Sequence, residues 1–235
     1  MENPVAYAFQ DGVATITMDD GKANAVSSAM QEALNAALEE ALADKAVVVL
    51  GGRAGTFCAG FHLPTLMAGG PDAVKMLAGG FELARRILTF PRPVVIACSG
   101  HALAMGAFLL LSGDFSVGAA GAFKIGANEV AIGLSMPHAA VEICRARLAP
   151  AHFLRAMMTS EIYRPEEAVA AGFLDRVVPE AEVLSEARAV AARFTQLNMN
   201  AYRETKQRVR APLLAALNGA MEADQAVFRQ LCKVA

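Results

Sequence analysis

One carboxylate stands out because of the residues around it. In the segment from Gly121 to Pro137, GAFKIGANEVAIGLSMP, Glu129 is the single acidic side chain, and Lys124 carries the only other formal charge. Apolar neighbours remove water from a carboxylate, which raises its proton affinity and suits it to general-base catalysis. The same residues also fit a strand end from which Glu129 points into water, so this segment alone leaves both interpretations open.

Two glycine-bearing segments could present backbone N–H groups to an anion. The first is TFCAGFHL at 56–63, soon after an apolar run, and the second is SGHALAMG at 99–106, which leads into an apolar stretch. Small residues let a backbone approach a ligand closely, and the start of a helix adds partial positive charge. Neither segment has the GxGxxG or GxxxxGK[ST] pattern, so a nucleotide phosphate site is not indicated. Taken singly, each glycine is also compatible with an ordinary turn.

Composition narrows the class of protein. The chain has 235 residues, of which 55% are hydrophobic, enough for one large domain or a domain with an appendage. Its formal net charge of −2 gives no basic surface of the kind that binds nucleic acid. The four cysteines are far apart and form no CxxC pair, which argues against a disulfide framework and against a zinc site.

No segment is expected to enter a membrane or direct secretion. The N-terminal MENPVAYAFQDG lacks a basic region followed by an apolar one. The stretch from Val94 to Ser112 is apolar enough to resemble a membrane span, but glycines, a serine and a histidine interrupt it and two prolines precede it. We interpret it as a buried strand followed by a buried helix, and expect a cytoplasmic protein.

The first half of the chain alternates strand-like and helix-like stretches. Val5 to Phe9 and Val13 to Met18 alternate apolar and polar residues around a Gln-Asp-Gly turn, which predicts a hairpin. A helix is predicted from Ser28 to Ala43, with Ser28 and Gln31 as a capping box. Further strands are predicted at 46–50, 94–98, 115–117 and 122–125, a Gly-rich loop at 51–60, and helices at 71–89 and from about 106 to 113.

After Pro137 helical patterns dominate. Helices are predicted at 138–147, 151–158, 165–171, 180–197, 199–209 and 213–233, with one strand at 173–178. This order indicates an α/β core over residues 1–178 and a C-terminal helical region over 179–235. The apolar residues of 213–231 are more than one isolated helix can hide, so we expect this tail to cover another surface, either of the same chain or of another subunit.

Together these stretches resemble the crotonase (enoyl-CoA hydratase/isomerase) superfamily over nearly the whole chain. FCAGFHL at 57–63 is similar to its F-[SCA]-A-G-x-[DH]-L loop, and GKANA at 21–25 to its early CoA-contacting segment. The stretch 93–114 is similar to P-x-[IV]-A-x-x-G…G…D, and RPEEA at 164–168 with GFLDRVVP at 172–179 to the downstream helix and strand. The order and spacing of these motifs make the resemblance specific.

The resemblance implies an α/β fold, a crotonase-like spiral of β-β-α units with an α-helical C-terminal region that forms a homotrimer or a dimer of trimers. It implies an acyl-CoA thioester as substrate, with no separate cofactor and no metal. The backbone N–H groups of Phe61 and Met105 would form the oxyanion hole, and Glu129 would be the catalytic base. Contacts with CoA or substrate are implied for Lys22, Ala23, Ala59, Gly60, Gly106, Phe108 and, in the tail, Lys206.

The chain departs from the family pattern at three positions. Met105 stands where glycine is usual, and His62 stands where many members have aspartate. Phe108 occupies the position at which hydratases have a second glutamate. Addition of water to a double bond uses two carboxylates to hold and activate the water, whereas Phe108 leaves one base. Asn128-Glu129 followed by Ile132-Gly133 is similar to the Δ3,Δ2-enoyl-CoA isomerase branch.

These observations favour an isomerase that moves a double bond from position 3 to position 2 of an enoyl thioester. Two alternatives remain open at this stage. One is an enoyl-CoA hydratase, or another crotonase-type reaction such as thioester hydrolysis, that works with a single carboxylate. The other is a catalytically weak acyl-CoA-binding paralogue, for which the changes at Met105 and His62 are the main support. His101 and His138 are expected to be structural.

Overall fold

A large and a small sheet organise the fold of the computed structural model, which describes residues 3–234. The large sheet has the order β1-β2-β3-β5-β7-β9 and is parallel except for the β1–β2 hairpin. The small parallel sheet has the order β4-β6-β8. The strands are β1 (Val5–Gln10), β2 (Val13–Met18), β3 (Val47–Gly51), β4 (Gly55–Cys58), β5 (Val94–Cys98), β6 (Gly100–Leu103), β7 (Phe115–Ala119), β8 (Ile125–Gly126) and β9 (Arg176–Val178).

The chain builds these sheets as a spiral. Each of the strands β3, β5 and β7 in the large sheet is followed directly by a strand of the small sheet, β4, β6 or β8, and then by a helical segment. Strands β3 and β5 are buried along their whole length, which explains their uninterrupted apolar sequences. The predicted α/β fold made of β-β-α units is therefore confirmed.

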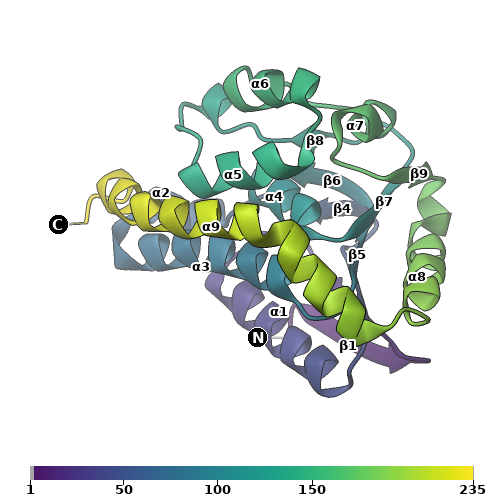
Figure 1. Cartoon of the computed structure of the whole chain (residues 1–235). Helices are drawn as coiled ribbons and strands as arrows, with labels where there is room; N and C mark the ends of the chain where they lie inside the picture. Colours follow the sequence, from purple (N-terminus) through teal and green to yellow (C-terminus); the bar gives the residue numbers. More distant parts are fainter. Residues whose placement is uncertain (1–2, 235) are drawn as a thin grey trace.

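Nine α-helices surround the sheets in the described part of the chain (Figure 1). They are α1 (Ser28–Ala43), α2 (Leu63–Ala68), α3 (Gly70–Thr89), α4 (Met105–Ser112), α5 (His138–Arg147), α6 (Pro150–Met158), α7 (Pro165–Ala171), α8 (Val183–Phe194) and α9 (Met199–Leu231), with short 3-10 turns at Val130–Ile132 and Glu180–Glu182. Helix α8 packs on the large sheet, and every residue of α4 is buried.

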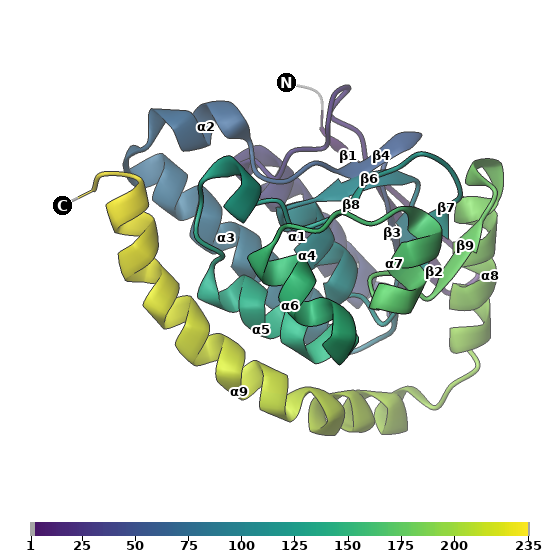
Figure 2. The same ribbon diagram turned by 90° about the horizontal axis from the view of Figure 1, so that it is seen from above.

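Helix α9 differs from the sequence prediction, because the two helices expected at 199–209 and 213–233 are one. Pro212 lies inside this helix of 33 residues. A proline removes one backbone donor, but a helix continues through it when neighbouring elements hold both sides. Figure 2 shows α9 as a long arc around α3, α5 and the rest of the molecule. Packing against the chain thus outweighs the local signal of Pro212.

Three smaller predictions also needed correction. The cap of α1 is Ser27, whose side chain accepts a hydrogen bond from Met30 N–H, and not Ser28. Gln31 does not close a capping box; its amide donates to the carbonyl oxygen of Met76 at 2.8 Å. The predicted strand at 122–125 is reduced to β8, and the expected loop at 51–60 contains β4.

The C-terminal helix covers its own chain. At its first half, the Lys206 ammonium lies 2.8 Å from the Asp114 carboxylate. Near its end, the Asp224 carboxylate accepts hydrogen bonds from the backbone N–H groups of His138 and Ala139, at 2.8 and 2.9 Å. The apolar tail is thus partly buried within one subunit, whereas contact with another subunit and a division of the chain after residue 178 stay predictions.

No helix within residues 3–234 combines the length and the apolar character that crossing a membrane requires.

Candidate active site

Three segments that are distant in sequence lie side by side around the start of α4. They are 21–25, the first loop at 56–63 and the second loop at 99–106. The backbone N–H of Ala59 donates to the carbonyl oxygen of Ala23 at 3.0 Å, and that of Val26 donates to Gly60 at 2.9 Å. The buried Asn24 fixes this arrangement, because its amide donates to the carbonyl oxygens of Met18, Thr56 and Phe57. The segment 21–25 is therefore held against the loop that contains Ala59 and Gly60.

The second loop meets the first at Gly60. A Cβ atom placed on Gly60 would lie 2.9 Å from the Cβ of Ala104 and 3.8 Å from the backbone nitrogen of Met105. Gly60 also has φ +104°, a value that favours glycine. The absence of a side chain here lets the Gly60-Phe61 peptide approach the start of α4, which brings together the two backbone donors expected from the sequence.

Both donors are available to a ligand. Met105 is the first residue of α4, so its N–H has no acceptor within the helix. Neither the Phe61 nor the Met105 N–H donates to another protein group among residues 3–234. Ala104, immediately before Met105, has φ 52° and ψ −125°. L-residues rarely adopt this backbone conformation, which costs of order 1–3 kcal/mol. Such local strain is typical of sites where the backbone must point its N–H in one direction.

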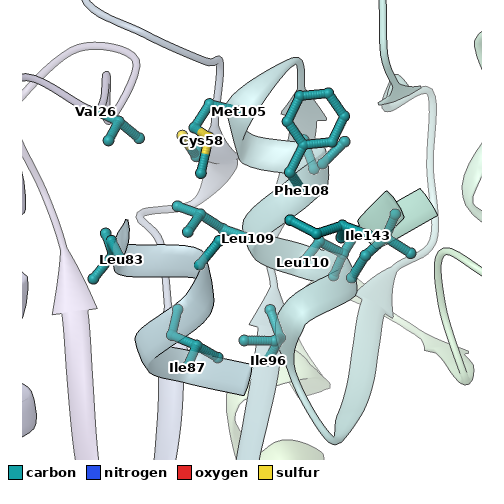
Figure 3. Packing of buried hydrophobic residues seen from close by; sticks show 14 of the residues in the cluster. Val26, Cys58, Leu83, Ile87, Ile96, Met105, Phe108, Leu109, Leu110 and Ile143 are labelled. Carbon is teal, nitrogen blue, oxygen red and sulfur yellow. The ribbon is translucent and has the colours of Figure 1, made fainter. Parts of the chain in front are cut away.

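The side chain of Met105 does not obstruct this site. It is fully buried, and its sulfur lies near Gly80 of α3, at 3.5 Å from the position of a Cβ on that glycine. Figure 3 shows Met105 beside Cys58, on the same helix as Phe108, Leu109 and Leu110. The Met105 side chain, which stands where glycine is usual in the family, therefore packs in the core between α3 and α4.

A cavity of about 310 Å³ opens next to the two donors. Its walls come from α2, α3, α4, the segment 128–137 and the end of α9. Most of the lining side chains are apolar, and Glu129 is the single carboxylate among the described residues that line it. The lining residues are Ala59, Phe61, Leu63, Leu66, Leu77, Ala104, Phe108, Asn128, Glu129, Ile132, Leu134, Ser135, Pro137, Val227, Phe228 and Leu231.

Glu129 is buried, which decides between the two interpretations that the sequence left open. Only 7% of the residue is exposed, and its Oε2 atom has no hydrogen-bond partner within the described residues 3–234. Burial raises the pKa of this carboxyl from 4.5 to about 7. A carboxylate with a pKa near neutrality can both accept and return a proton at physiological pH.

The segment around Glu129 is held by its backbone. The Glu129 carbonyl oxygen accepts a hydrogen bond from Leu134 N–H at 2.9 Å, which closes the turn that contains the 3-10 segment Val130–Ile132. The N–H of Ala131 donates to the Ser160 hydroxyl at 3.1 Å. These bonds fix the carboxylate at the wall of the cavity without occupying its free oxygen.

Phe108 forms another part of the cavity wall, from within α4. It is 1% exposed, and its ring packs on that of Phe81 with centroids 6.0 Å apart. Gly106, next to the donor Met105, does not line the cavity; a side chain there would collide with the backbone carbonyl of Cys58. Gly106 thus allows α4 to start against β4, while Phe108 shapes the cavity itself.

Lys206 does not reach this site. Its ammonium is buried against Asp114 and the carbonyl oxygen of Ile87, at 2.8 and 3.4 Å, and it lines a different hollow. Burial lowers the pKa of Lys206 to about 8, with Asp114 opposing that shift. Within its own chain Lys206 therefore does not line this cavity, and the contact with CoA phosphates that the resemblance implied stays a prediction. Lys22, in contrast, is exposed beside Ala23, where a contact with CoA stays a prediction.

The histidines have structural contacts. The His62 ring lies 2.9 Å from the Thr65 hydroxyl at the start of α2, and the His101 ring accepts a hydrogen bond from Lys124 N–H. His138 begins α5 and contributes its backbone N–H to Asp224. No group of three or more histidine, cysteine, aspartate or glutamate side chains able to hold a metal ion occurs within residues 3–234.

Sequence reasoning missed the part of the site that comes from α2 and α9. Leu63 and Leu66 line the cavity from the short α2, and Val227, Phe228 and Leu231 line it from the end of α9. The helical spacing of the three α9 residues was a usable signal of a shared face. Nothing in the local pattern, however, shows that this face returns to the loops that precede it by more than 100 residues.

Comparisons with known proteins agree with this geometry. A family model described as enoyl-CoA hydratase/isomerase matches residues 8–235. A putative enoyl-CoA hydratase from Thermus thermophilus is 32% identical over 214 residues, which cover 88% of this chain and 82% of the relative.

Solved structures give a closer match. An enoyl-CoA hydratase/isomerase family protein from Pseudomonas syringae is 46% identical with a TM-score of 0.93, over 95% of this chain and 97% of that one. The enoyl-CoA isomerase of Mycobacterium tuberculosis is 45% identical with a TM-score of 0.92, over 96% of this chain and 99% of that one. The cavity, its paired backbone donors and these similarities over the whole fold lead to one conclusion: the chain belongs to the enoyl-CoA hydratase/isomerase family, the crotonase superfamily of enzymes.

Proposed function

We propose that this enzyme is a Δ3,Δ2-enoyl-CoA isomerase in which Glu129 is the single acid–base group. The observation that carries the proposal is the solitary, buried carboxylate of Glu129 in an otherwise mainly apolar cavity. Moving a double bond requires one group that takes a proton and returns it nearby. A pKa of about 7 lets Glu129 act in both directions. The Mycobacterium tuberculosis protein, 45% identical, is called an enoyl-CoA isomerase in one structure and a probable enoyl-CoA hydratase in another, so the proposal depends on the site and not on that name.

The reaction would proceed through an enolate of the thioester. Glu129 removes a proton from C2 of the 3-enoyl thioester, and the electron pair of that C–H bond forms a C1–C2 double bond while the thioester oxygen gains the negative charge. When the carbonyl re-forms, this pair becomes the C2–C3 double bond. The former C3–C4 π pair then takes the proton from Glu129 at C4, so no atom is gained or lost.

The negative oxygen would be stabilised by the backbone N–H groups of Phe61 and Met105. Both lack an acceptor in the described part of the chain, and the contact at Gly60 holds the loop of Phe61 next to the start of α4. Preorganised donors of this kind need no reorientation as charge develops, and each is worth about 2.7–4 kcal/mol of barrier in comparable sites. The strained backbone at Ala104 supports this role, because it sets the direction of the first N–H of α4.

Hydration of a 2-enoyl thioester is the second candidate, and the name of the Thermus thermophilus relative favours it. Hydration would need a water molecule held and activated between two carboxylates. Phe108, 1% exposed, offers an apolar ring where the second carboxylate of hydratases is expected. The binding-only alternative loses one of its two supports, because the Met105 side chain is buried away from the cavity.

One assay separates these functions. The purified protein is incubated with 3-enoyl-CoA and, separately, with 2-enoyl-CoA, and the absorbance of the conjugated enoyl thioester is followed. An isomerase raises the signal from 3-enoyl-CoA and leaves 2-enoyl-CoA without net hydration. A hydratase lowers the signal from 2-enoyl-CoA, and a binding protein changes neither. A signal that falls with 2-enoyl-CoA and does not rise with 3-enoyl-CoA would overturn the proposal.

A further inference from the structure

One residue lines both the active-site cavity and a second hollow. Phe228 lines the cavity of about 310 Å³ that contains Glu129. It also lines a hollow of about 10 Å³ between α3 and α9, together with Ala78, Phe81, Met221, Asp224 and Gln225. The Phe228 ring is therefore the wall at which the first cavity ends and the second begins.

This wall is fixed from both sides. The residue is 3% exposed, and its ring stacks on that of Phe81 with centroids 6.1 Å apart and planes at 15°. One turn earlier in α9, Asp224 binds the first N–H groups of α5 at 2.8 and 2.9 Å. Just after the helix, the Cys232 carbonyl oxygen accepts a hydrogen bond from Gly70 N–H at 2.8 Å. Phe228 can therefore not move away from the cavity without disturbing α3 and α5.

The cavity next to this wall suits an unbranched hydrocarbon chain. Leu66, Leu77 and Phe228 contribute apolar surface, and the polar groups gather around Glu129 and the two backbone donors. If each non-hydrogen atom occupies about as much space as a water molecule, about 30 Å³, the cavity holds on the order of ten such atoms. That is the length of a medium acyl chain.

We propose that Phe228 sets the acyl-chain length of this enzyme by closing the active-site cavity against the hollow between α3 and α9. The proposal rests on the function proposed above, since it assumes that the cavity receives the acyl group of a CoA thioester. Removing the ring would join the two spaces and leave room for about four further methylene groups. The end of α9 of the same chain thus limits the length of acyl chain that the cavity accepts.

Binding of saturated acyl-CoAs tests this wall without depending on catalysis. Affinities for chains of increasing length are measured by calorimetry with the full-length protein. For the wild type, we expect the affinity to rise about fourfold with each methylene group and then to stop rising near a chain of about ten carbons. For Phe228→Ala, the rise should continue for about four more carbons. Phe228→Leu, which keeps apolar bulk in the core, should extend it by about one.

Met221→Ala is the matched control. Met221 lies on the same helix and lines only the second hollow, so its truncation enlarges that hollow without opening the wall. Its length limit should equal that of the wild type. Thermal unfolding selects the folded variants, and Phe228→Leu keeps the test valid if Phe228→Ala does not fold. A folded Phe228 variant with the wild-type limit, or a limit shifted equally by Met221→Ala, would overturn the proposal.

The outcome is independent of the reaction type. If the Phe228 variants shift the binding limit but the wild type does not isomerise 3-enoyl-CoA, the assignment of the wall stands and the proposed isomerase function is wrong. If 3-enoyl-CoA is isomerised while the limit does not depend on Phe228, the assignment of the wall alone fails.

Discussion

At the scale of single residues, the chemistry depends on how Glu129 is desolvated. Glu129→Gln keeps the shape of the side chain and removes the basic carboxylate. Because general-base catalysis contributes about 10²–10⁴-fold, we expect turnover of 3-enoyl-CoA to fall by at least the lower figure, while affinity for a saturated acyl-CoA changes little. Steady-state kinetics and calorimetry on the same preparation check both parts. Near-normal isomerase turnover in this variant would eliminate the single-base mechanism.

The raised pKa of Glu129, about 7, predicts two pH dependences. Since the base must be ionised, kcat/KM should rise about tenfold per pH unit below pH 7 and level off above it. The folded protein binds this proton more tightly than the unfolded chain, whose carboxyl has a pKa near 4.5. The free energy of unfolding should therefore decrease between about pH 4.5 and 7, by on the order of 3 kcal/mol, and lose no more above.

Denaturant titrations of wild type and Glu129→Gln at a series of pH values isolate this second contribution. The difference in free energy of unfolding between the two proteins should grow in favour of the variant as the pH rises to 7. A difference that is constant across this range would show that the Glu129 pKa is not raised in the folded state.

Phe108 is the residue that would decide between isomerisation and hydration. Phe108→Glu places a second carboxylate in the wall of the cavity that contains Glu129, so hydratase activity should rise relative to isomerase activity. The new charge is buried next to Phe81 and will destabilise the fold, which makes thermal unfolding a necessary companion measurement. Phe108→Leu is the control, since it alters the wall without adding a charge. An unchanged product ratio in folded Phe108→Glu would remove this residue from the explanation.

At the scale of elements, local sequence signals predicted some boundaries correctly, whereas contacts between distant residues determined others. Helix α5 and strand β5 have the predicted bounds, because Pro137 and the prolines before Val94 mark their starts within the sequence itself. The helix break predicted near Pro212 is wrong, because the packing of α9 on α3 and α5 maintains the helix through this proline. The ion pair of Lys206 could not be predicted for a similar reason: its partner Asp114 is 92 residues away, and no local pattern indicates that pair.

Asp224 shows how one element positions another, and it can be tested. Its carboxylate caps α5 from α9, immediately after the segment 128–137 that lines the cavity. Asp224→Ala leaves two backbone N–H groups without their acceptor, so we expect the free energy of unfolding to fall by about 1–2 kcal/mol. Asp224→Asn keeps one acceptor oxygen and should lose less. Chemical denaturation measures both, with the exposed Glu222→Ala on the same helix as control. Equal losses in the three variants would contradict a capping role.

At the scale of the whole molecule, the exposed apolar surface lies only partly on the tail that the sequence suggested, where Val227 is 36% and Leu231 42% exposed. Much of the tail is buried against its own chain, with Leu217 and Phe228 fully enclosed. Large apolar side chains are exposed also on α6 and on the neighbouring 3-10 turn: Leu154 is 60% exposed, Met158 67% and Ile132 58%. Leu154 and Met158 are one helical turn apart, so they share a face.

This face leads to the last prediction, which concerns assembly. Contiguous exposed apolar side chains of this size are typical of protein interfaces, and Ile132 also lines the active-site cavity. We therefore expect the protein to sediment as a trimer or a hexamer, with the α6 face buried between copies.

Leu154→Glu combined with Met158→Glu should shift sedimentation towards the monomer, because two charges would have to be desolvated at the contact. Val209→Glu, on an exposed turn of α9, tests the tail in the same assay. If only the α9 variant dissociates the assembly, the interface lies on the tail as the sequence alone suggested; a wild-type monomer at micromolar concentration would contradict assembly altogether.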